Sequence, residues 1–357
     1  MNKKVCSFPI LFALLALLIG TCAVVFPASA QAAPTSTGSI TVSGTVASSY
    51  DAYQIFSANV VDGDSDAKIA TDLAWASDAV RDAALPVLHS AGMPNSQTTA
   101  QEAAEWLNTD SHLTSALSAQ LARSLQSSGA EPVALNAGTA AELPCGYWLI
   151  VAKDDAISQN EAGTAPVMAL VGGSAVTVKP KAATPKVQKH VLEDSTAAWQ
   201  KAADATVADD LYWRLSATVP AGLAAYDTYT VRFVDTMSAG LDPSKVAASM
   251  RVYAAAGTDG GFDAVSADKD GRAGTEPAKG WTDITAQCAT KVAADGKTFT
   301  VRTGDLIAVL GGADAFTAGA RVVAVYNAPL NSACNHGIAK GNPNEVYLRY
   351  PRSPFAD

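Results

Sequence analysis

The sequence predicts a mainly β protein of two tandem β-sandwich domains, the first of which carries a helical insert. Three observations lead to this fold class. Short segments of alternating apolar and polar residues recur along the chain, turn clusters rich in Gly, Asp and Pro separate them, and one Ala- and Leu-rich stretch in the first half has a helical period instead. With 357 residues, 48% of them hydrophobic, the chain is long enough for two domains with a core each.

The first 33 residues have the layout of a secretory signal peptide. Lys3 and Lys4 precede an apolar run, and a small-residue stretch follows in which A-x-A cleavage is expected after Ala30 or Ala32. The apolar run approaches the length of a membrane anchor, but the cleavage sites follow it directly and no second such run occurs. We expect a cleaved signal at 1–33 and a mature protein outside the cell, secreted or on the cell surface, with no membrane association.

The first domain is expected at 38–178. Ile40 and Val42 alternate with polar residues, as does the segment around Ile55, and strands resume after residue 133. Between them lies the helical insert, with an Ala-rich stretch at 73–85 and a capping box at 99–102. A leucine stripe with a spacing of four is expected to face the core; it consists of Leu113, Leu117, Leu121 and Leu125.

A linker at 179–186 follows, because this segment contains two prolines and no large apolar residue. The second domain is expected at 187–357. It has at least six strand-like segments without long helices between them, which favours an antiparallel sandwich or barrel.

Several function classes are excluded by composition and by motifs. The net charge of −9 becomes −11 when Lys3 and Lys4 leave with the signal, which argues against nucleic acid as a partner. The four histidines have no ligand spacing and no cysteine pair suggests zinc, so we expect no metal and no cofactor. No nucleophile elbow, P-loop or dinucleotide fingerprint occurs, and the protein is not expected to be an enzyme.

The cysteines do not form a disulfide framework. Cys6 and Cys22 lie in the signal, and three cysteines remain in the mature chain. Cys145 precedes an apolar strand and is expected to be a small buried residue. Cys288 and Cys334 belong to the same domain and are a candidate disulfide pair.

Informative motifs lie in the second domain. Lys189 stands in a K-x-V pattern after the linker, 233–241 reads F-V-D-T-M-S-A-G-L, 326–331 reads Y-N-A-P-L-N, and Asn344 opens a terminal N-x-V-x-L. Together these motifs resemble the isopeptide-forming fimbrial domain of Gram-positive, sortase-assembled pilin subunits, over roughly 185–351. More loosely, the first domain is similar to the first domain of such pilins, through its Y-D-A-Y-Q-I-F, G-Y-W-L-I-V and closing V-x-V-x-P-K segments.

The resemblance implies an immunoglobulin-like sandwich that forms an intramolecular amide bond as it folds. By motif position the bond joins Lys189 to Asn344, and Asp235 assists the reaction. Burial would favour a neutral, nucleophilic lysine amine and a protonated aspartate that polarises the asparagine carboxamide. Asn342, in the same G-N-P-N segment, is the alternative acceptor.

The resemblance also implies partners, namely other pilin subunits and a pilin sortase. Shaft pilins carry a V-x-V-Y-P-K lysine to which the sortase joins the next subunit, and the corresponding segment here is V-T-V-K-P-K with Lys181 in the lysine position. The tyrosine is replaced by Lys179, so a solvated linker lysine is an equal alternative. No L-P-x-T-G sorting signal occurs, and we expect either a chain truncated before a third domain or a freely secreted protein.

A structural pilus subunit that supports adhesion is therefore the expected function. The alternative is a secreted or surface adhesin module, in which the helical insert or the loop at 257–280 recognises a host protein or glycan. A binding face of this kind needs aromatic anchors, and within that loop Phe262 is the only aromatic residue before the stretch ends at Gly280.

Overall fold

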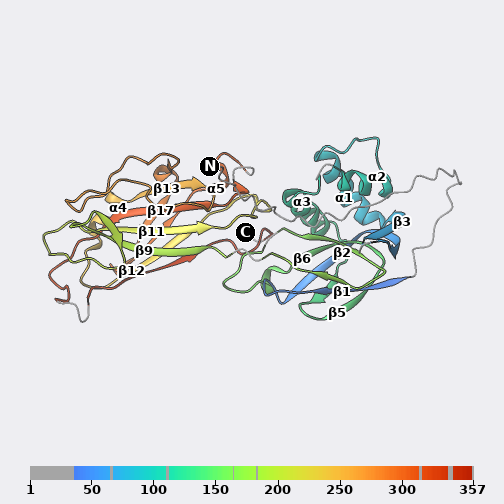
Figure 1. Cartoon of the computed structure of the whole chain (residues 1–357), viewed down its shortest axis with the longest axis horizontal. Helices are drawn as coiled ribbons and strands as arrows, with labels where there is room; N and C mark the ends of the chain where they lie inside the picture. The colour runs from blue at the N-terminus through green and yellow to red at the C-terminus, as the bar shows by residue number, and fades with distance from the viewer. Residues whose placement is uncertain are drawn as a thin grey trace, which may run out of the picture.

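The protein is described by a computed structural model that covers residues 36–64, 67–109, 112–163, 165–181, 184–312, 316–336 and 341–355. Figure 1 shows an elongated molecule in which two domains follow one another along the long axis, the first at right and the second at left. The predicted mainly β fold class, with the long helices in the first domain, is confirmed. The predicted signal at 1–33 lies outside the described residues. No helix in the described part of the chain has the length and apolar character needed to span a membrane.

The first domain contains two β-sheets. The larger sheet has the order β3-β2-β6-β7, with β4 also pairing with β2, and the smaller sheet has the order β5-β1-β8. All pairs are antiparallel except β1 with β8. The strands are β1 (Thr37–Val42), β2 (Ser49–Asp62), β3 (Lys68–Trp75), β4 (Val133–Asn136), β5 (Ala140–Pro144), β6 (Gly146–Ala152), β7 (Val167–Val171) and β8 (Val176–Val178).

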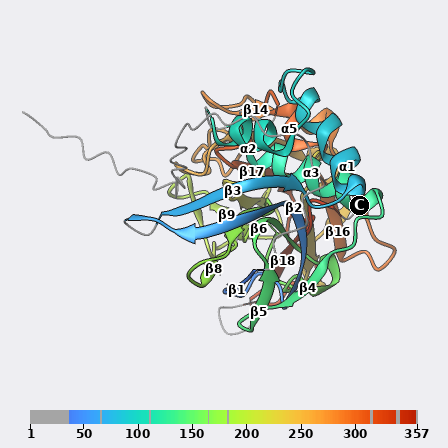
Figure 2. The same cartoon turned by 90° about the vertical axis from the view of Figure 1, so that its right-hand side faces the viewer.

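The larger sheet is the middle layer of this domain. Successive side chains of a strand point to opposite faces: Trp148 and Ile150 of β6 join the core shared with the smaller sheet, whereas Leu149 and Val151 join the core under the helices. Figure 2 shows the helices on one side of this sheet and the smaller sheet on the other. An unbroken apolar run such as that of β6 is what a strand buried on both faces requires.

Three helices make up the insert, α1 (Asp78–Ser90), α2 (Ala100–Asn108) and α3 (Ser115–Ser127). The predicted capping box at the start of α2 is confirmed, since Thr99 and Glu102 exchange hydrogen bonds there. The leucine stripe faces the core as predicted, with Leu117, Leu121 and Leu125 buried in α3. Its first member, Leu113, precedes the helix and is half-buried against the same core.

The predicted start of the insert was too early. Residues as far as Trp75 belong to β3, where Trp75 pairs with Phe56 of β2. The helix begins only after Ser77, whose hydroxyl accepts a hydrogen bond from the backbone N–H of Val80 and so caps the first turn. The pairing of Trp75 with β2 and the cap at Ser77 together set the start of the helix. Alanine content alone placed this start several residues too early.

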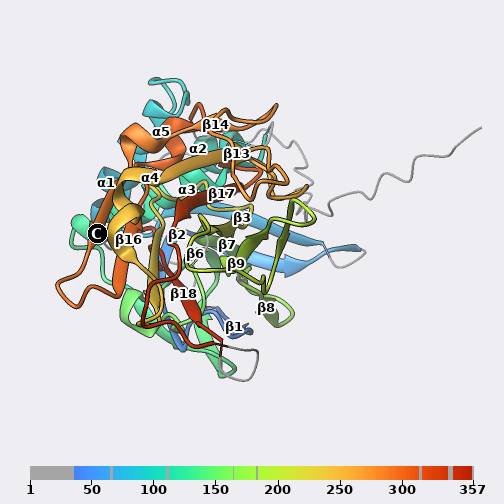
Figure 3. The ribbon, with the colours of Figure 1, turned by 90° about the vertical axis from the view of Figure 1, so that its left-hand side faces the viewer.

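The second domain is a sandwich of two antiparallel sheets, seen from its outer end in Figure 3. One sheet has the order β10-β9-β11-β17-β13-β14 and the other has the order β15-β16-β12-β18. The strands are β9 (Lys186–Glu193), β10 (Ala198–Gln200), β11 (Tyr212–Val219), β12 (Arg232–Met237), β13 (Arg251–Ala256), β14 (Thr282–Asp283), β15 (Ala289–Val292), β16 (Thr298–Arg302), β17 (Ala320–Asn327) and β18 (Asn344–Arg349); two one-turn helices, α4 (Val246–Ser249) and α5 (Leu306–Val309), lie at the ends of the sandwich.

The last described residues return to the junction between the domains, where Figure 1 places the C-terminal end. The backbone N–H of Gly163 donates to the carbonyl oxygen of Arg352 at 2.7 Å, and the Tyr226 hydroxyl donates to the carbonyl oxygen of Gly163 at 3.0 Å. The guanidinium of Arg123 on α3 lies 3.1 Å from the Asp227 carboxylate. The domains therefore contact one another directly, in addition to being joined by the linker.

The candidate disulfide is not formed, because Cys145, Cys288 and Cys334 are all free thiols. Cys288 directly precedes β15. The first residue of β15 pairs with the last residue of β16, which in turn pairs with the first residue of β12, so Cys288 lies near the start of β12. Cys334 packs against Gly240, just beyond the other end of β12. A six-residue strand spans about 20 Å, and a disulfide requires Cα atoms within about 7 Å. The two cysteines thus lie at opposite ends of the sandwich.

Candidate functional site: a buried lysine, aspartate, tyrosine and asparagine

Four polar side chains from four strands are linked inside the second domain. Lys189 comes from β9 and Tyr326 from β17, both in one sheet, while Asp235 comes from β12 and Asn344 from β18 in the facing sheet. The site therefore spans the interior of the sandwich, and it joins the first strand of the domain to the last.

The strand pattern explains why these polar residues point inward. Lys189 pairs across the strands with Leu215, a fully buried residue of β11, and such partners share a face of the sheet. Asp235 stands between Phe233 and Met237, which are both buried, so it occupies the interior face of β12 by alternation. Asn344 pairs with Met237 and is half-buried.

The four side chains form one continuous hydrogen-bonded chain. The ammonium of Lys189 donates to Oδ2 of Asp235 in a very short contact. The hydroxyl of Tyr326 donates to the same oxygen at 3.2 Å and accepts a hydrogen bond from Nδ2 of Asn344 at 2.8 Å. Tyr326 is thus the residue that joins Asn344 to the lysine and the aspartate.

The surroundings of the ion pair are aromatic. Nζ of Lys189 lies 5.2 Å from the ring centroid of Trp213 and 5.8 Å from that of Tyr326, whose ring packs against Phe299. Burial lowers the pKa of Lys189 to about 8, although the Asp235 carboxylate acts in the opposite direction. Burial raises the pKa of Asp235 to about 6, against the opposing effect of Lys189. Both shifts favour the neutral forms of the pair.

Two buried oxygen atoms of the site have no hydrogen-bond donor among the described residues. They are Oδ1 of Asp235 and Oδ1 of Asn344. Unpaired acceptors in a dry interior are costly, typically about 1 to 3 kcal/mol each. A proton on Asp235 would remove one acceptor and supply one donor, so the arrangement suits a neutral aspartic acid better than a carboxylate.

Asn342, the alternative acceptor, is engaged elsewhere. Its Oδ1 accepts a hydrogen bond from the backbone N–H of Asn335 at 2.9 Å, and its Nδ2 donates to the carbonyl oxygen of the same residue at 3.2 Å. These contacts place Asn342 in the loop that precedes β18, beside Gly240.

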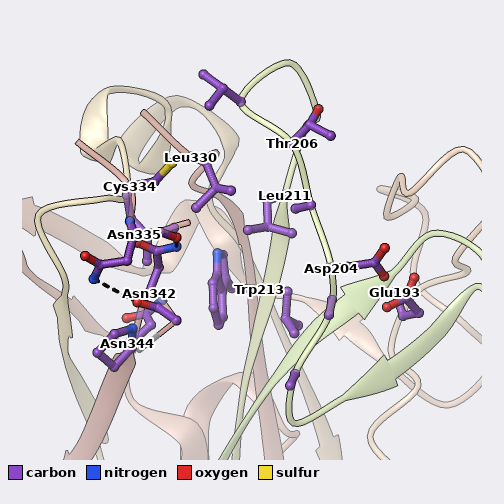
Figure 4. A pocket seen from close by; sticks show the side chains of 18 of the residues that line it. Glu193, Asp204, Thr206, Leu211, Trp213, Leu330, Cys334, Asn335, Asn342 and Asn344 are labelled. Carbon is purple, nitrogen blue, oxygen red and sulfur yellow. Dashed lines mark hydrogen bonds between the residues drawn. The ribbon is translucent and has the colours of Figure 1, made fainter. Parts of the chain in front are cut away.

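A pocket of about 990 Å³ opens beside Asn344 (Figure 4). Trp213 and Asn344 line both the pocket and the site, and Leu211 and Leu330 contribute apolar walls, while Asp204 lies on the opposite rim. The asparagine side of the site therefore faces an opening, whereas Asp235 is fully buried.

Lys181 lies on the linker, far in sequence from this site, and is exposed. Its neighbours at 182–183 are outside the described residues. Among the described residues, no group of three or more His, Cys, Asp or Glu side chains is arranged to hold a metal ion.

Two residues of the site are not identified as such from the sequence. Tyr326 belongs to one of the motifs that carry the resemblance, without a role of its own, and Trp213 is part of an ordinary strand pattern. Their positions follow from pairing, since Trp213 and Tyr326 are direct partners on β11 and β17. A large aromatic residue in a strand otherwise rich in Ala and Val is the one signal that points to Tyr326.

Comparison with known proteins returns similarity in structure alone. No protein-family model and no curated protein matches the sequence. The solved structures that the chain resembles include pilins of Gram-positive bacteria, the family named by the resemblance of the motifs.

Three of these structures illustrate the likeness. The T6 backbone pilin of Streptococcus pyogenes is 13% identical, with 89% of this chain and 63% of that chain covered and a TM-score of 0.42. The major pilin SpaA of Corynebacterium diphtheriae, whose structure points to a modular pilus assembly with stabilising isopeptide bonds, is 12% identical, with coverages of 90% and 63% and a TM-score of 0.39. The RrgB pilus protein of Streptococcus pneumoniae is 17% identical, with coverages of 63% and 34% and a TM-score of 0.35. The chain thus spans about a third to two thirds of these pilins, and with TM-scores below 0.5 the function proposed below rests on the residues of the site.

Proposed function

We propose that this protein is an exported structural subunit of a pilus, and that its second domain is stabilised by an autocatalytic amide bond between Lys189 and Asn344. The observation that carries the proposal is the buried chain of contacts from Lys189 through Asp235 and Tyr326 to Asn344. A structural core gains little from a lysine and an aspartate enclosed by aromatic rings, because burying an ion pair costs about as much as the pair returns. The same arrangement suits amide chemistry.

The reaction forms one bond and breaks another. The neutral amine of Lys189 attacks Cγ of Asn344, the bond from Cγ to Nδ2 breaks, and the proton that Nζ loses leaves with Nδ2 as ammonia. Asp235, protonated on Oδ1, would donate to Oδ1 of Asn344 and stabilise the charge that develops there. This hydrogen bond would satisfy both of the oxygens that lack donors in the structure.

Folding supplies the rate enhancement. The sandwich holds the amine and the carboxamide together, and intramolecular reactions with favourable geometry reach effective molarities of about 10⁵ to 10⁸ M. Each chain reacts once and is its own substrate, so the protein is not an enzyme in the ordinary sense.

The bond would serve a mechanical purpose. It would join β9 to β18, which are the first and last strands of the domain and belong to different sheets. Tension that enters through the linker could then leave at the C-terminal end without separating the sheets. By the loop-entropy estimate for cross-links, the bond would also add about 5 kcal/mol to the free energy of unfolding.

Intact mass of the folded protein tests this proposal. The parent should be lighter than its sequence mass by one ammonia, whereas Lys189→Ala and Asn344→Ala should have their full sequence masses. Lys186→Ala is the matched control, since Lys186 is an exposed lysine of the same strand and its removal should leave the loss of ammonia intact. Asn342→Ala should also retain the loss; if it abolishes the loss and Asn344→Ala does not, the acceptor is Asn342.

Assembly into a pilus is a separate part of the proposal. Lys181 is exposed on the linker, where a sortase could reach it. Incubation with a pilin sortase and a subunit that bears the sorting signal should give a covalent product that is lost in Lys181→Arg and kept in Lys179→Arg. A product that persists in Lys181→Arg would assign the attachment to another lysine.

A further inference from the structure

The hydroxyl of Tyr326 occupies the position between the acid and the leaving group. It lies 3.2 Å from Oδ2 of Asp235 and 2.8 Å from Nδ2 of Asn344, and Nδ2 is the atom that departs as ammonia. On its other side, Oδ2 of Asp235 accepts a hydrogen bond from Nζ of Lys189. Nζ, Oδ2, the phenolic oxygen and Nδ2 therefore form an unbroken series of hydrogen-bonded atoms from nucleophile to leaving group.

We propose that Tyr326 is a catalytic residue which passes the proton released by Lys189 from Asp235 to the departing nitrogen of Asn344. The inference rests on the proposed function, because it concerns the same amide-forming reaction. The role is to carry the proton from Asp235 to Nδ2 of Asn344. Asp235 cannot do this directly, because no hydrogen bond joins it to Nδ2 among the described contacts.

The transfer conserves protons and electrons overall. As Nζ attacks Cγ, Oδ1 of Asp235 gives its proton to Oδ1 of Asn344, and Nζ gives one proton to Oδ2 of the resulting carboxylate. The Tyr326 hydroxyl, which donates to Oδ2 in the structure, turns about its C–O bond to point its proton at Nδ2. Oδ2 then gives its proton to the phenolic oxygen while the phenolic proton moves to Nδ2 and the bond from Cγ to Nδ2 breaks. As the carbonyl group forms again, Oδ1 of Asn344 returns its proton to Oδ1 of Asp235. Asp235 and Tyr326 end in their initial states, and the only products are the amide and ammonia. The phenol is never required to become a free phenolate, which burial of its ring makes unfavourable by raising the pKa of Tyr326.

Among the described residues, the two aromatic neighbours Phe299 and Trp213 offer no other route for this proton. The ring of Phe299 packs against Tyr326 with centroids 4.8 Å apart and carries no polar atom. The indole N–H of Trp213 donates to the carbonyl oxygen of Ala328 at 3.2 Å and is occupied. On the far side of Asn344 the pocket in Figure 4 gives ammonia a path to solvent.

The decisive experiment compares Tyr326→Phe with Tyr229→Phe. Tyr229 is a fully buried tyrosine of the same core whose hydroxyl has no partner among the described residues, so its variant reports what loss of a buried phenolic oxygen does by itself. The full chain is recovered unfolded from inclusion bodies, refolded by dilution and quenched in acid, and the loss of ammonia is followed by intact mass. We expect Tyr326→Phe to release ammonia at least about 100-fold more slowly than the parent, the usual scale of proton-transfer catalysis, and Tyr229→Phe to match the parent.

A second measurement separates proton transfer from positioning. Fluorinated tyrosine at position 326 keeps the hydroxyl and its two contacts but makes the phenol more acidic, and the rate should change with the acidity of the phenol, whereas a positioning role predicts a constant rate. Folding is monitored in every variant by tryptophan fluorescence. Equal rates for Tyr326→Phe and Tyr229→Phe, with ammonia still lost, would overturn the relay and leave the amide bond standing. Full sequence mass in the parent would overturn both.

Discussion

Among the described residues, Lys68 in the first domain and Lys189 in the second are lysines whose side chains are almost entirely enclosed. The side chains of Lys68 in the first domain and Lys189 in the second are both 9% exposed. Their surroundings differ. Lys68 donates to the carbonyl oxygens of Gly172 and Ser174, to the Ser174 hydroxyl and to Asp62. Lys189 has Asp235 as its one hydrogen-bond acceptor among the described residues, with aromatic rings on its other sides.

The difference teaches that burial alone does not create a nucleophile. The oxygens around Lys68 replace the water that the ammonium loses on burial. The hydrogen bonds of Lys68 thereby connect β3 to the turn after β7. Around Lys189 the lost water is replaced by a single carboxylate, which is itself pushed toward its neutral form. Where acceptors are few, the charged form of the lysine is destabilised, and the neutral, reactive amine becomes easier to reach.

Loss of Lys189 should have the largest effect. Lys189→Met removes the cross-link, and the free energy of unfolding of the second domain should fall by about 5 kcal/mol from loop entropy, with a further cost because Asp235 is left buried without its partner. Chemical denaturation followed by tryptophan fluorescence measures this. The double variant Lys189→Met, Asp235→Leu separates the two costs, since it lacks the cross-link but also lacks the unpaired carboxyl. An unfolding free energy equal to that of the parent would contradict a cross-link.

Loss of Lys68 should be milder and purely structural. Lys68→Met leaves the carbonyl oxygens of Gly172 and Ser174 without a donor, which should lower the free energy of unfolding of the first domain by about 2 kcal/mol. Lys153→Met in the same domain is the control, because its pair with Asp51 at 3.2 Å is partly exposed and should contribute below about 1 kcal/mol. Intact mass should still show the loss of ammonia. If Lys68→Met abolishes that loss, the comparison between the lysines is wrong.

The rate of ammonia release should depend on pH in a way that identifies the pair. The reactive state consists of a neutral Lys189 amine and a protonated Asp235. It carries one titratable proton in total, the same number as the ion pair of ammonium and carboxylate. Below a pH of about 6, Asp235 becomes protonated while Lys189 keeps its charge; above about 8, the pair has lost both protons. The rate should be level between these limits and fall by roughly tenfold per pH unit outside them. A rate that keeps rising above pH 8 would show that Asp235 need not be protonated.

The smallest expected effect concerns Glu345, an exposed neighbour on β18 whose charge raises the pKa of Lys189. In Glu345→Gln the upper limit of the level region should move to lower pH by less than about one unit, since an exposed charge is screened by water. Glu142→Gln, an exposed glutamate of the first domain, should leave the limit unchanged. A shift of the lower limit instead would mean that Glu345 acts on Asp235.

Much of the architecture was predictable from sequence because the signals are local. Alternating residues predict β11 and β16 at their observed bounds, and the Thr99 capping box predicts the start of α2. The start of the insert was not predictable in this way, because the pairing of Trp75 with Phe56 depends on the preceding strand β2 and not on the residues next to the helix.

The candidate site was likewise predictable in part, in its residues but not in their contacts. The motifs by themselves name Lys189, Asp235 and Asn344, and they do so through resemblance to a family. Only the tertiary structure decides that Lys189 meets Asp235 across 46 residues, that Tyr326 lies between Asp235 and Asn344, and that Cys288 and Cys334 lie apart. The physical reason is that alternation along a strand tells which face a side chain occupies, whereas contact between facing sheets depends on strand order and register, which long-range pairing sets.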